Sequence, residues 1–242
     1  MKNVLITGAS RGIGAACARI FSENGFRVFI NYFKSADRAE QLCSELREKG
    51  ADAFTFCADV SDCEQVEKMM SEISSRFGGV DILINNAGIA AQIMFCDISE
   101  QDWDRMFDIN IKGMYLCTQK ALPYMINKKS GSIVNLSSMW GISGASCEVH
   151  YSAAKAAVIG FTKALAKELG PSGIRVNCVA PGAVATEMNA ALSDEDIAAL
   201  CDETPLGKIA APDEIAKAIY YMAVTDTFST GQILSPNGGL VI

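Results

Sequence analysis

The sequence predicts a single α/β domain over residues 1–242, built as a doubly wound parallel sheet of seven strands with helices on both faces. Short runs rich in β-branched residues alternate with longer segments of helical period along the chain. Several of these runs are apolar on both faces, as buried parallel strands are. Half of the residues are hydrophobic and 20% are charged, a composition typical of a globular protein with a large core. No linker-like stretch divides the chain.

The strands and helices are expected in strict alternation. The expected strands are residues 3–7, 27–33, 53–58, 81–86, 132–137, 174–180 and 232–235. Helices are expected to begin near residues 12, 36, 62, 99, 151 and 212. Glycines at 25, 50 and 78–79 stand where helices commonly end. Residues 188–208 interrupt the alternation with the short helical pattern "SDEDIAALCDE", which predicts a lid over the carboxyl ends of the strands.

Charge and composition exclude several classes of function. The formal net charge is −7, and no basic stripe with interleaved aromatic residues is present, so we expect no binding to nucleic acid. One histidine and nine scattered cysteines without a C-x-x-C pair predict neither a metal site nor a disulfide framework. The first apolar run is too short for a secretory signal, and no apolar stretch is long enough to span a membrane. A soluble cytoplasmic protein is expected.

The stretch "TGASRGIG" at residues 7–14 follows the first strand and opens a helix. Gly8, Gly12 and Gly14 keep the turn free of side chains, so backbone amides and the helix N-terminus can face a pyrophosphate. The spacing G-x-x-x-G-x-G differs from the G-x-G-x-x-G of the commoner dinucleotide fold. A tight turn without a ligand is the alternative, but its place in the first strand-helix connection favours a dinucleotide site.

The end of the second strand indicates which dinucleotide is bound. NAD sites usually carry an acid there, which accepts hydrogen bonds from the ribose 2′-hydroxyl and repels a 2′-phosphate. This chain has no acid after that strand until Asp37, whereas Arg11 and Lys34 can supply positive charge. The neutral donors nearby are Ser10, Asn31 and Ser35. These residues predict NADP(H); the alternative is that Arg11 is a solvated turn residue and Lys34 a solvated loop charge.

The stretch "EVHYSAAK" contains the only histidine beside a tyrosine and a lysine. Tyr151 and Lys155 are four residues apart and share one helix face, whereas His150 points elsewhere. An adjacent ammonium lowers the pKa of a phenol from about 10 toward neutrality, so the pair can act as acid and base. His150 is expected to be a partly exposed residue at the helix start. Ser138, at the end of the fifth strand, can bond a substrate oxygen.

These residues carry a family resemblance. Over essentially its full length, the chain resembles the short-chain dehydrogenases/reductases, which implies a single-domain Rossmann fold. The matching motifs are T-G-x-x-x-G-x-G (7–14), Asp59-Val60, N-N-A-G (85–88), Asn110, Ser138, Y-x-x-x-K (151–155) and Pro181-Gly182 followed by Thr186. Each motif is weak alone, but their joint order and spacing are specific.

The resemblance implies a role for each catalytic residue. Tyr151 gives a proton to a ketone oxygen that Ser138 holds, while the nicotinamide delivers hydride to the carbon. Lys155 lowers the tyrosine pKa and binds the nicotinamide ribose, and Asn110 fixes a water that links the lysine to solvent. The residues expected to contact the cofactor are Gly8, Ser10, Arg11, Gly12, Ile13, Gly14, Asn31, Lys34, Ser35, Asp59, Val60, Asn86, Ala87, Gly88, Tyr151, Lys155, Pro181, Gly182, Val184 and Thr186.

Within the family the chain is similar to bacterial 3-oxoacyl-[acyl-carrier-protein] reductases in length, in the glycine loop, in "PLGKIAAPDEIA" (205–216) and in "TGQILSPNGG" (230–239). This similarity implies reduction of a 3-oxoacyl thioester in fatty acid biosynthesis, an acyl carrier protein as partner, and a homotetramer. Carrier proteins are acidic, and Lys128 and Lys129 are the basic residues expected beside the active-site mouth. That branch often has an arginine at the position of Ser172.

The stretch "SSMWGISGASCEVHYSAAK" (137–155) resembles a second branch, which reduces the 5-aminopentanone group on a lysine of elongation factor P. Glu148, one turn before Tyr151, either faces an amine-bearing ketone or is a helix N-terminal acid favoured by the macrodipole. Trp140 either roofs the pocket or packs in the core. A redox-silent NADP sensor or scaffold is a further alternative. The complete set of candidate catalytic residues argues against it, since no structural role requires Asn110, Ser138, Tyr151 and Lys155 together.

Overall fold

The computed structural model describes residues 1–189 and 193–242. Within these residues seven strands form one parallel sheet in the order β3-β2-β1-β4-β5-β6-β7. The strands are β1 (Asn3–Ile6), β2 (Arg27–Tyr32), β3 (Ala53–Cys57), β4 (Ile82–Asn85), β5 (Gly131–Leu136), β6 (Ile174–Val179) and β7 (Ile233–Leu234). The order of the strands reverses between β1 and β4, and ligands bind at such a switch point in open α/β sheets.

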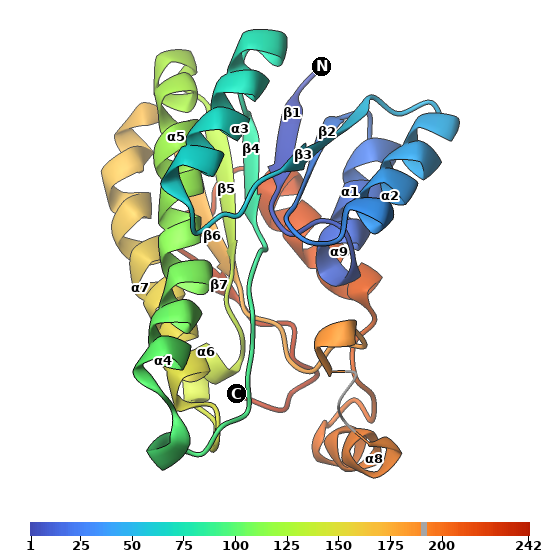
Figure 1. Ribbon diagram of the computed structural model, residues 1–242, viewed down its shortest axis with the longest axis vertical. Helices are drawn as coiled ribbons and strands as arrows, with labels where there is room; N and C mark the ends of the chain where they lie inside the picture. The colour runs from blue at the N-terminus through green and yellow to red at the C-terminus, as the bar shows by residue number, and fades with distance from the viewer. Residues whose placement is uncertain (190–192) are drawn as a thin grey trace.

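Helices cover both faces of the sheet (Figure 1). The α-helices are α1 (Gly12–Glu23), α2 (Ala36–Glu48), α3 (Cys63–Phe77), α4 (Glu100–Phe107), α5 (Gly113–Lys128), α6 (Trp140–Ser143), α7 (Val149–Leu169), α8 (Asp194–Glu203) and α9 (Pro212–Tyr220). Helices α1, α2 and α9 pack on one face, and α3, α5 and α7 pack on the other. Helix α8 stands apart at the lower end of the molecule in Figure 1. Among the described helices, none combines the length and apolar character needed to cross a membrane.

Two hydrophobic cores flank the sheet, one under each layer of helices. Successive residues of β1 alternate between them: Val4 and Ile6 pack with α1 and α9, and Leu5 packs with α3 and α5. All three side chains are fully buried. Because both faces of the strand are covered, β1 is apolar at each position from Val4 to Ile6.

The predicted fold is confirmed. Each expected strand is present within one residue of its predicted bounds, and the six expected helices begin within two residues of their predicted starts. The glycines expected to end helices have left-handed backbone, with φ of 76° at Gly25, 84° at Gly50 and 90° at Gly78. The short helix α6 was not predicted. Helix α8 forms inside the expected lid, of which residues 190–192 lie outside the described residues.

Candidate active site

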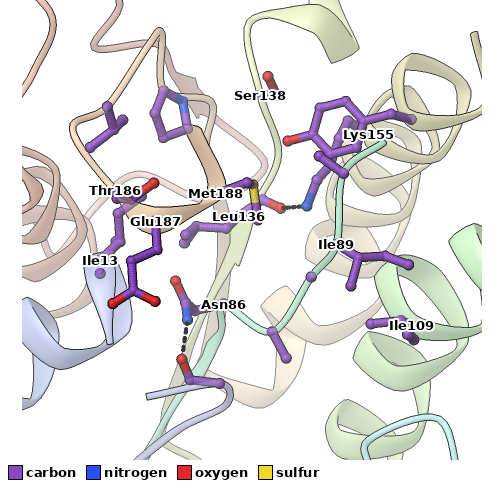
Figure 2. A pocket seen from close by; sticks show the side chains of 18 of the residues that line it. Ile13, Asn86, Ile89, Ile109, Leu136, Ser138, Lys155, Thr186, Glu187 and Met188 are labelled. Atoms are coloured by element: carbon purple, nitrogen blue, oxygen red, sulfur yellow. Dashed lines mark hydrogen bonds between the residues drawn. The ribbon is translucent and has the colours of Figure 1, made fainter. Parts of the chain in front are cut away.

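A cleft of about 1320 Å³ opens at the carboxyl ends of the strands. Its walls come from the loops after β1, β2, β3, β4, β5 and β6, which the parallel sheet brings to one edge. Of the residues predicted for catalysis or cofactor binding, all line this cleft except Gly14 and Asn110. Figure 2 shows that Ile13, Asn86, Ser138, Lys155 and Thr186, from five different segments, surround the same space.

The glycine loop after β1 packs directly against the N-N-A-G loop after β4. The Thr7 hydroxyl oxygen accepts hydrogen bonds from the backbone amides of Asn86 and Ala87, each at 3.0 Å, and the Asn86 side chain donates to the Thr7 carbonyl at 2.8 Å. A Cβ on Gly8, whose φ is +62°, would lie 2.9 Å from the Ala87 Cα. Only glycine permits this approach of two backbones.

Gly14 supports the loop from behind instead of lining the cleft. A Cβ at this position would lie 2.6 Å from the Asn86 side-chain nitrogen and 2.7 Å from the Gly8 carbonyl oxygen. Asn31 also serves the loop: its Oδ1 accepts a hydrogen bond from the Gly8 amide at 3.2 Å, and its Nδ2 donates to the Ala58 carbonyl at 3.0 Å. The neutral donor predicted at Asn31 is therefore engaged with backbone atoms.

Positive charge gathers beside the end of β2. Arg11 donates a hydrogen bond from Nη1 to the Ser35 hydroxyl at 3.4 Å, and its Nε lies 3.6 Å from the Glu187 carboxylate. Glu187 also forms an ion pair with Arg38 in the first turn of α2. Neither Arg38 nor Glu187 was among the residues predicted for this site. Arg38 lies one helical turn after the predicted site residue Ser35, and this spacing could have identified it. No local pattern indicates Glu187.

Ser138 and Lys155 point into the inner end of the cleft (Figure 2), which Tyr151 also lines. Ser138 follows β5, and the other two residues lie on α7. The adjacent Ser137 donates from its hydroxyl to the Lys155 carbonyl at 2.7 Å, which fixes the end of β5 against α7. As predicted from the strand pleat, the two serines face different ways. The Lys155 Nζ donates to the Leu136 carbonyl at 3.1 Å and lies 5.6 Å from the centroid of the Tyr151 ring.

The expected acid shift of the phenol is wrong for this structure. Burial raises the pKa of Tyr151 to about 12, while a hydrogen bond with the Ser138 side chain lowers it and the Glu148 charge raises it further. Burial also lowers the pKa of Lys155 to about 8. Desolvation opposes the charged form of each group, and for the phenol it outweighs the hydrogen bond with Ser138.

Asn110 lies in a π-helical turn, Asp108–Lys112, that joins α4 to α5. Its side-chain nitrogen donates to the Met106 carbonyl at 2.9 Å and to the Ile89 carbonyl at 3.1 Å. Its Oδ1 is buried and has no hydrogen-bond partner among the described residues. A Cβ on Gly88 would lie 2.6 Å from this oxygen and 3.3 Å from the Lys155 Nζ, so an acceptor and a donor face one small space beside Gly88.

These features fit a nicotinamide dinucleotide. The glycine loop and the start of α1 present backbone amides where phosphates bind at helix N-termini. Arg11 and Lys34 supply cations near the end of β2. The acceptor at Asn110 and the donor at Lys155 suit a bridging water, as the family resemblance implies. Within residues 1–189 and 193–242, no group of three or more His, Cys, Asp or Glu residues is placed to hold a metal ion.

His150 is fully buried, so the expectation of partial exposure is wrong. It lies on α7, against which α4 packs, and in the described part of the chain both ring nitrogens lack hydrogen-bond partners. Glu148 lines the cleft and accepts a hydrogen bond from the Gln92 side chain at 3.3 Å. Burial raises its pKa. Trp140 was expected either to roof the pocket or to pack in the core, and it does both: it lines the cleft and packs against the buried cluster that contains Tyr151.

The basic residues expected at the mouth lie elsewhere on this chain. Lys128 forms an ion pair with Asp81, which directly precedes β4. Lys129 ends α5 just before β5. Both lysines are therefore at the amino ends of the strands, the edge opposite the cleft. Helices α4 and α8 and the start of α7 instead contribute one cation, Arg105, and four acids to the described lining: Asp104, Glu148, Asp196 and Glu203.

Comparisons with known proteins agree with this geometry. The family model described as short chain dehydrogenase matches residues 2–197. A 3-oxoacyl-[acyl-carrier-protein] reductase of Staphylococcus aureus is 42% identical over 240 residues, which cover 99% of this chain and 98% of that protein. A protein of the same name from Synechocystis is 38% identical, covering 98% of this chain and 96% of its own length.

A solved structure from Agrobacterium tumefaciens, described as a candidate gluconate dehydrogenase, superposes with a TM-score of 0.95 at 30% identity. The match covers 99% of this chain and 95% of that one. The chain therefore belongs to the short-chain dehydrogenase/reductase family and is an oxidoreductase acting on CH–OH and C=O groups.

Proposed function

We propose that this protein is an NADPH-dependent ketone reductase that converts 3-oxoacyl thioesters to 3-hydroxyacyl thioesters on an acyl carrier protein. One observation carries the proposal: Ser138, Tyr151 and Lys155 meet at the inner end of a cleft that begins at the glycine loop. The names of the relatives at 38–42% identity support the thioester as substrate.

When bound, the cofactor supplies a hydride to the carbonyl carbon. Ser138 holds the carbonyl oxygen by a hydrogen bond, and the Tyr151 phenol donates its proton to that oxygen. A phenol with a pKa of about 12 is fully protonated at neutral pH, so it is ready to act as an acid in the reductive direction. The Lys155 ammonium stabilises the phenolate left behind, and Asn110 holds the water through which a proton returns from solvent.

The preference for NADPH rests on charge at the end of β2. Arg11 and Ser35 touch each other there, Lys34 lies beside them in the cleft, and the strand ends without an acid. Guanidinium groups bind phosphate strongly through paired donors. The test compares kcat/KM for NADPH and NADH with the same ketone. A higher value for NADH would contradict the proposal.

Turnover on a 3-oxoacyl carrier protein tests the substrate directly. We expect oxidation of NADPH that depends on the 3-oxo group and that stops in Tyr151→Phe. Failure to reduce any ketone, together with tight binding of NADPH, would support the sensor or scaffold instead.

A specific observation favours a second candidate, reduction of the 5-aminopentanone group on elongation factor P. Glu148 is half-buried in the cleft with a neutral partner, Gln92, and the acids of α4 and α8 surround the opening. A carboxylate in a desolvated site attracts an ammonium group and repels an acidic carrier protein. Glu148→Gln should reduce turnover on aminopentanonylated elongation factor P selectively if this candidate is right. Equal turnover by wild type and variant on both substrates would contradict it.

We also propose a cytoplasmic homotetramer with a lid at residues 188–208, of which residues 190–192 lie outside the described structure. The described part of the lid, including Met188 and Leu200, lines the outer cleft. Partly exposed aromatic side chains on α4 and α5, Trp103 and Tyr115, support assembly through these helices.

A further inference from the structure

Two arginines beside the glycine loop share one carboxylate from a distant part of the chain. Arg11 belongs to the loop after β1, and Arg38 belongs to the first turn of α2. Glu187, in the short 3-10 helix Glu187–Asn189, accepts a hydrogen bond from Arg38 Nη1 and lies 3.6 Å from Arg11 Nε. Its carboxylate thus bridges the two guanidinium groups.

This carboxylate stands where a 2′-phosphate is expected. Arg11 also contacts the hydroxyl of Ser35, the third residue after β2, at 3.4 Å. Arg11, Ser35 and Glu187 line the main cleft, and an adjoining pocket of about 540 Å³ extends from Arg11 to Arg38. A guanidinium group binds phosphate and carboxylate with the same planar set of donors. A bound 2′-phosphate and Glu187 would therefore compete for the same cations.

We propose that Glu187 is a specificity-determining residue: an internal anion that holds Arg11 and Arg38 until the 2′-phosphate of the cofactor displaces it. Arg38 is then a second phosphate ligand beside Arg11. This inference rests on the proposed use of NADPH and adds a residue that weakens phosphate binding.

The exposure of the ion pairs makes the exchange feasible. About half of each side chain is accessible: 55% for Arg11, 51% for Arg38 and 51% for Glu187. Exposed ion pairs of this kind contribute little to stability. A phosphate monoester carries nearly two negative charges at neutral pH and offers three acceptor oxygens, so it outcompetes a single carboxylate. Neighbouring Thr186 and Met188 both line the cleft, so Glu187 lies within the cofactor cleft and not on a remote surface.

The test measures binding of 2′,5′-ADP and 5′-AMP by calorimetry, without any reaction. Glu187→Gln should tighten binding of 2′,5′-ADP about three- to tenfold, because the phosphate no longer displaces two weak ion pairs. Binding of 5′-AMP should change less than about twofold, because it has no 2′-phosphate. Arg38→Gln should weaken 2′,5′-ADP about tenfold and leave 5′-AMP unchanged.

Glu72→Gln is the matched control. Glu72 forms a similarly exposed ion pair with Arg76 on α3, away from the cleft, and its replacement removes the same single charge. Both affinities should stay at the wild-type values. An effect of Glu72→Gln equal to that of Glu187→Gln would show a general effect of net charge and contradict the inference.

Two results separate the failure of this inference from the failure of the proposed function. If wild-type protein does not prefer 2′,5′-ADP over 5′-AMP, the NADPH proposal is wrong and the inference fails with it. If the preference exists but Glu187→Gln leaves it unchanged or weakens binding of 2′,5′-ADP, only the inference is wrong. In the weakening case, Glu187 orients the two arginines for the phosphate instead of competing with it.

Discussion

Tyr151 and Lys155 both lose most of their contact with water where α7 meets the end of β5. The same burial moves the pKa values of the phenol and the ammonium apart, raising the first to about 12 and lowering the second to about 8. The phenol is therefore protonated over the whole physiological range. The pKa of Lys155 lies close to neutrality, so in the proposed mechanism we expect the lysine to control how activity depends on pH.

Removal of the phenol hydroxyl tests the proton donor. Tyr151→Phe should lower kcat for ketone reduction by a factor on the order of 10² to 10⁴, the contribution of a general acid. The Kd for NADPH should stay close to the wild-type value, because the change removes one oxygen from the cleft. Stopped-flow turnover and fluorescence titration with NADPH measure the two quantities. A variant that keeps full turnover would show that another group donates the proton.

The pH profile tests the lysine. Below pH 8 the Lys155 ammonium is present to stabilise the nascent phenolate, and above pH 8 it is lost, since its pKa is lowered to about 8. We expect kcat for reduction to be level on the acid side and to fall about tenfold per pH unit on the basic side. Measurement of kcat with saturating substrates across this range gives the profile. A rate that increases through pH 8 would contradict the role given to Lys155.

The loops that follow the parallel strands pack on one another, and these contacts fix the positions of the site residues. The loops after β1 and β4 interlock through Thr7, Asn86 and the glycines at 8 and 14. The π-helical turn between α4 and α5 points Asn110 toward Gly88, where its Oδ1 shares a space with Lys155. Local widening of a helix by one residue is a frequent feature of functional sites.

Substitution of a glycine tests the interlocked loops. Gly14→Ala should destabilise the protein by about 1–3 kcal/mol, because the new methyl group would overlap the Asn86 side chain and the Gly8 carbonyl. Gly160→Ala is the control, since Gly160 lies inside α7 and its Cβ would meet no described atom within 4 Å. That variant should be more stable by about 0.5–1 kcal/mol. Urea unfolding measures both, and equal effects would contradict the packing argument.

At the scale of the whole molecule, the sheet order separates two edges with different roles. The carboxyl edge collects the glycine loop, the catalytic residues and the acids of α4 and α8, while Lys128 and Lys129 lie at the amino edge. Among the described residues that line the cleft, seven are acids and four are cations, so the lining is acidic on balance. This favours a cationic group on the substrate and lowers the encounter rate with an acidic partner.

The protein is expected to assemble as a tetramer of identical chains. Sedimentation velocity should give the mass of four chains, with apolar side chains such as Trp103 and Tyr115 buried between subunits. Replacement of both by lysine should shift the protein toward dimers or monomers, because buried charge without a partner is costly at an interface. A wild-type protein that sediments as a monomer at micromolar concentration would contradict the proposed tetramer.

The fold, and the place in the cleft of nearly all the residues predicted for the site, were predictable because they follow from local patterns. Apolar runs such as Val4 to Ile6 predict buried parallel strands, and the spacing of Tyr151 and Lys155 places them on one helix face regardless of the rest of the chain. Burial was not predictable in the same way. His150 was expected to be partly exposed, but it is fully buried on α7, against which α4 packs from up to 50 residues earlier in the chain.

The sequence by itself determined the alternation of strands and helices, the glycine loop and the residue types available for proton transfer, since each depends on neighbours along the chain. The tertiary structure decided the burial, the pKa values and the ion pairs, because these depend on residues that are distant along the chain. Desolvation sets the pKa values of Tyr151 and Lys155, and the ion pairs of Glu187 join segments about 150 residues apart. Such contacts form only when the sheet brings its loops to one edge, because no local pattern encodes which loops become neighbours.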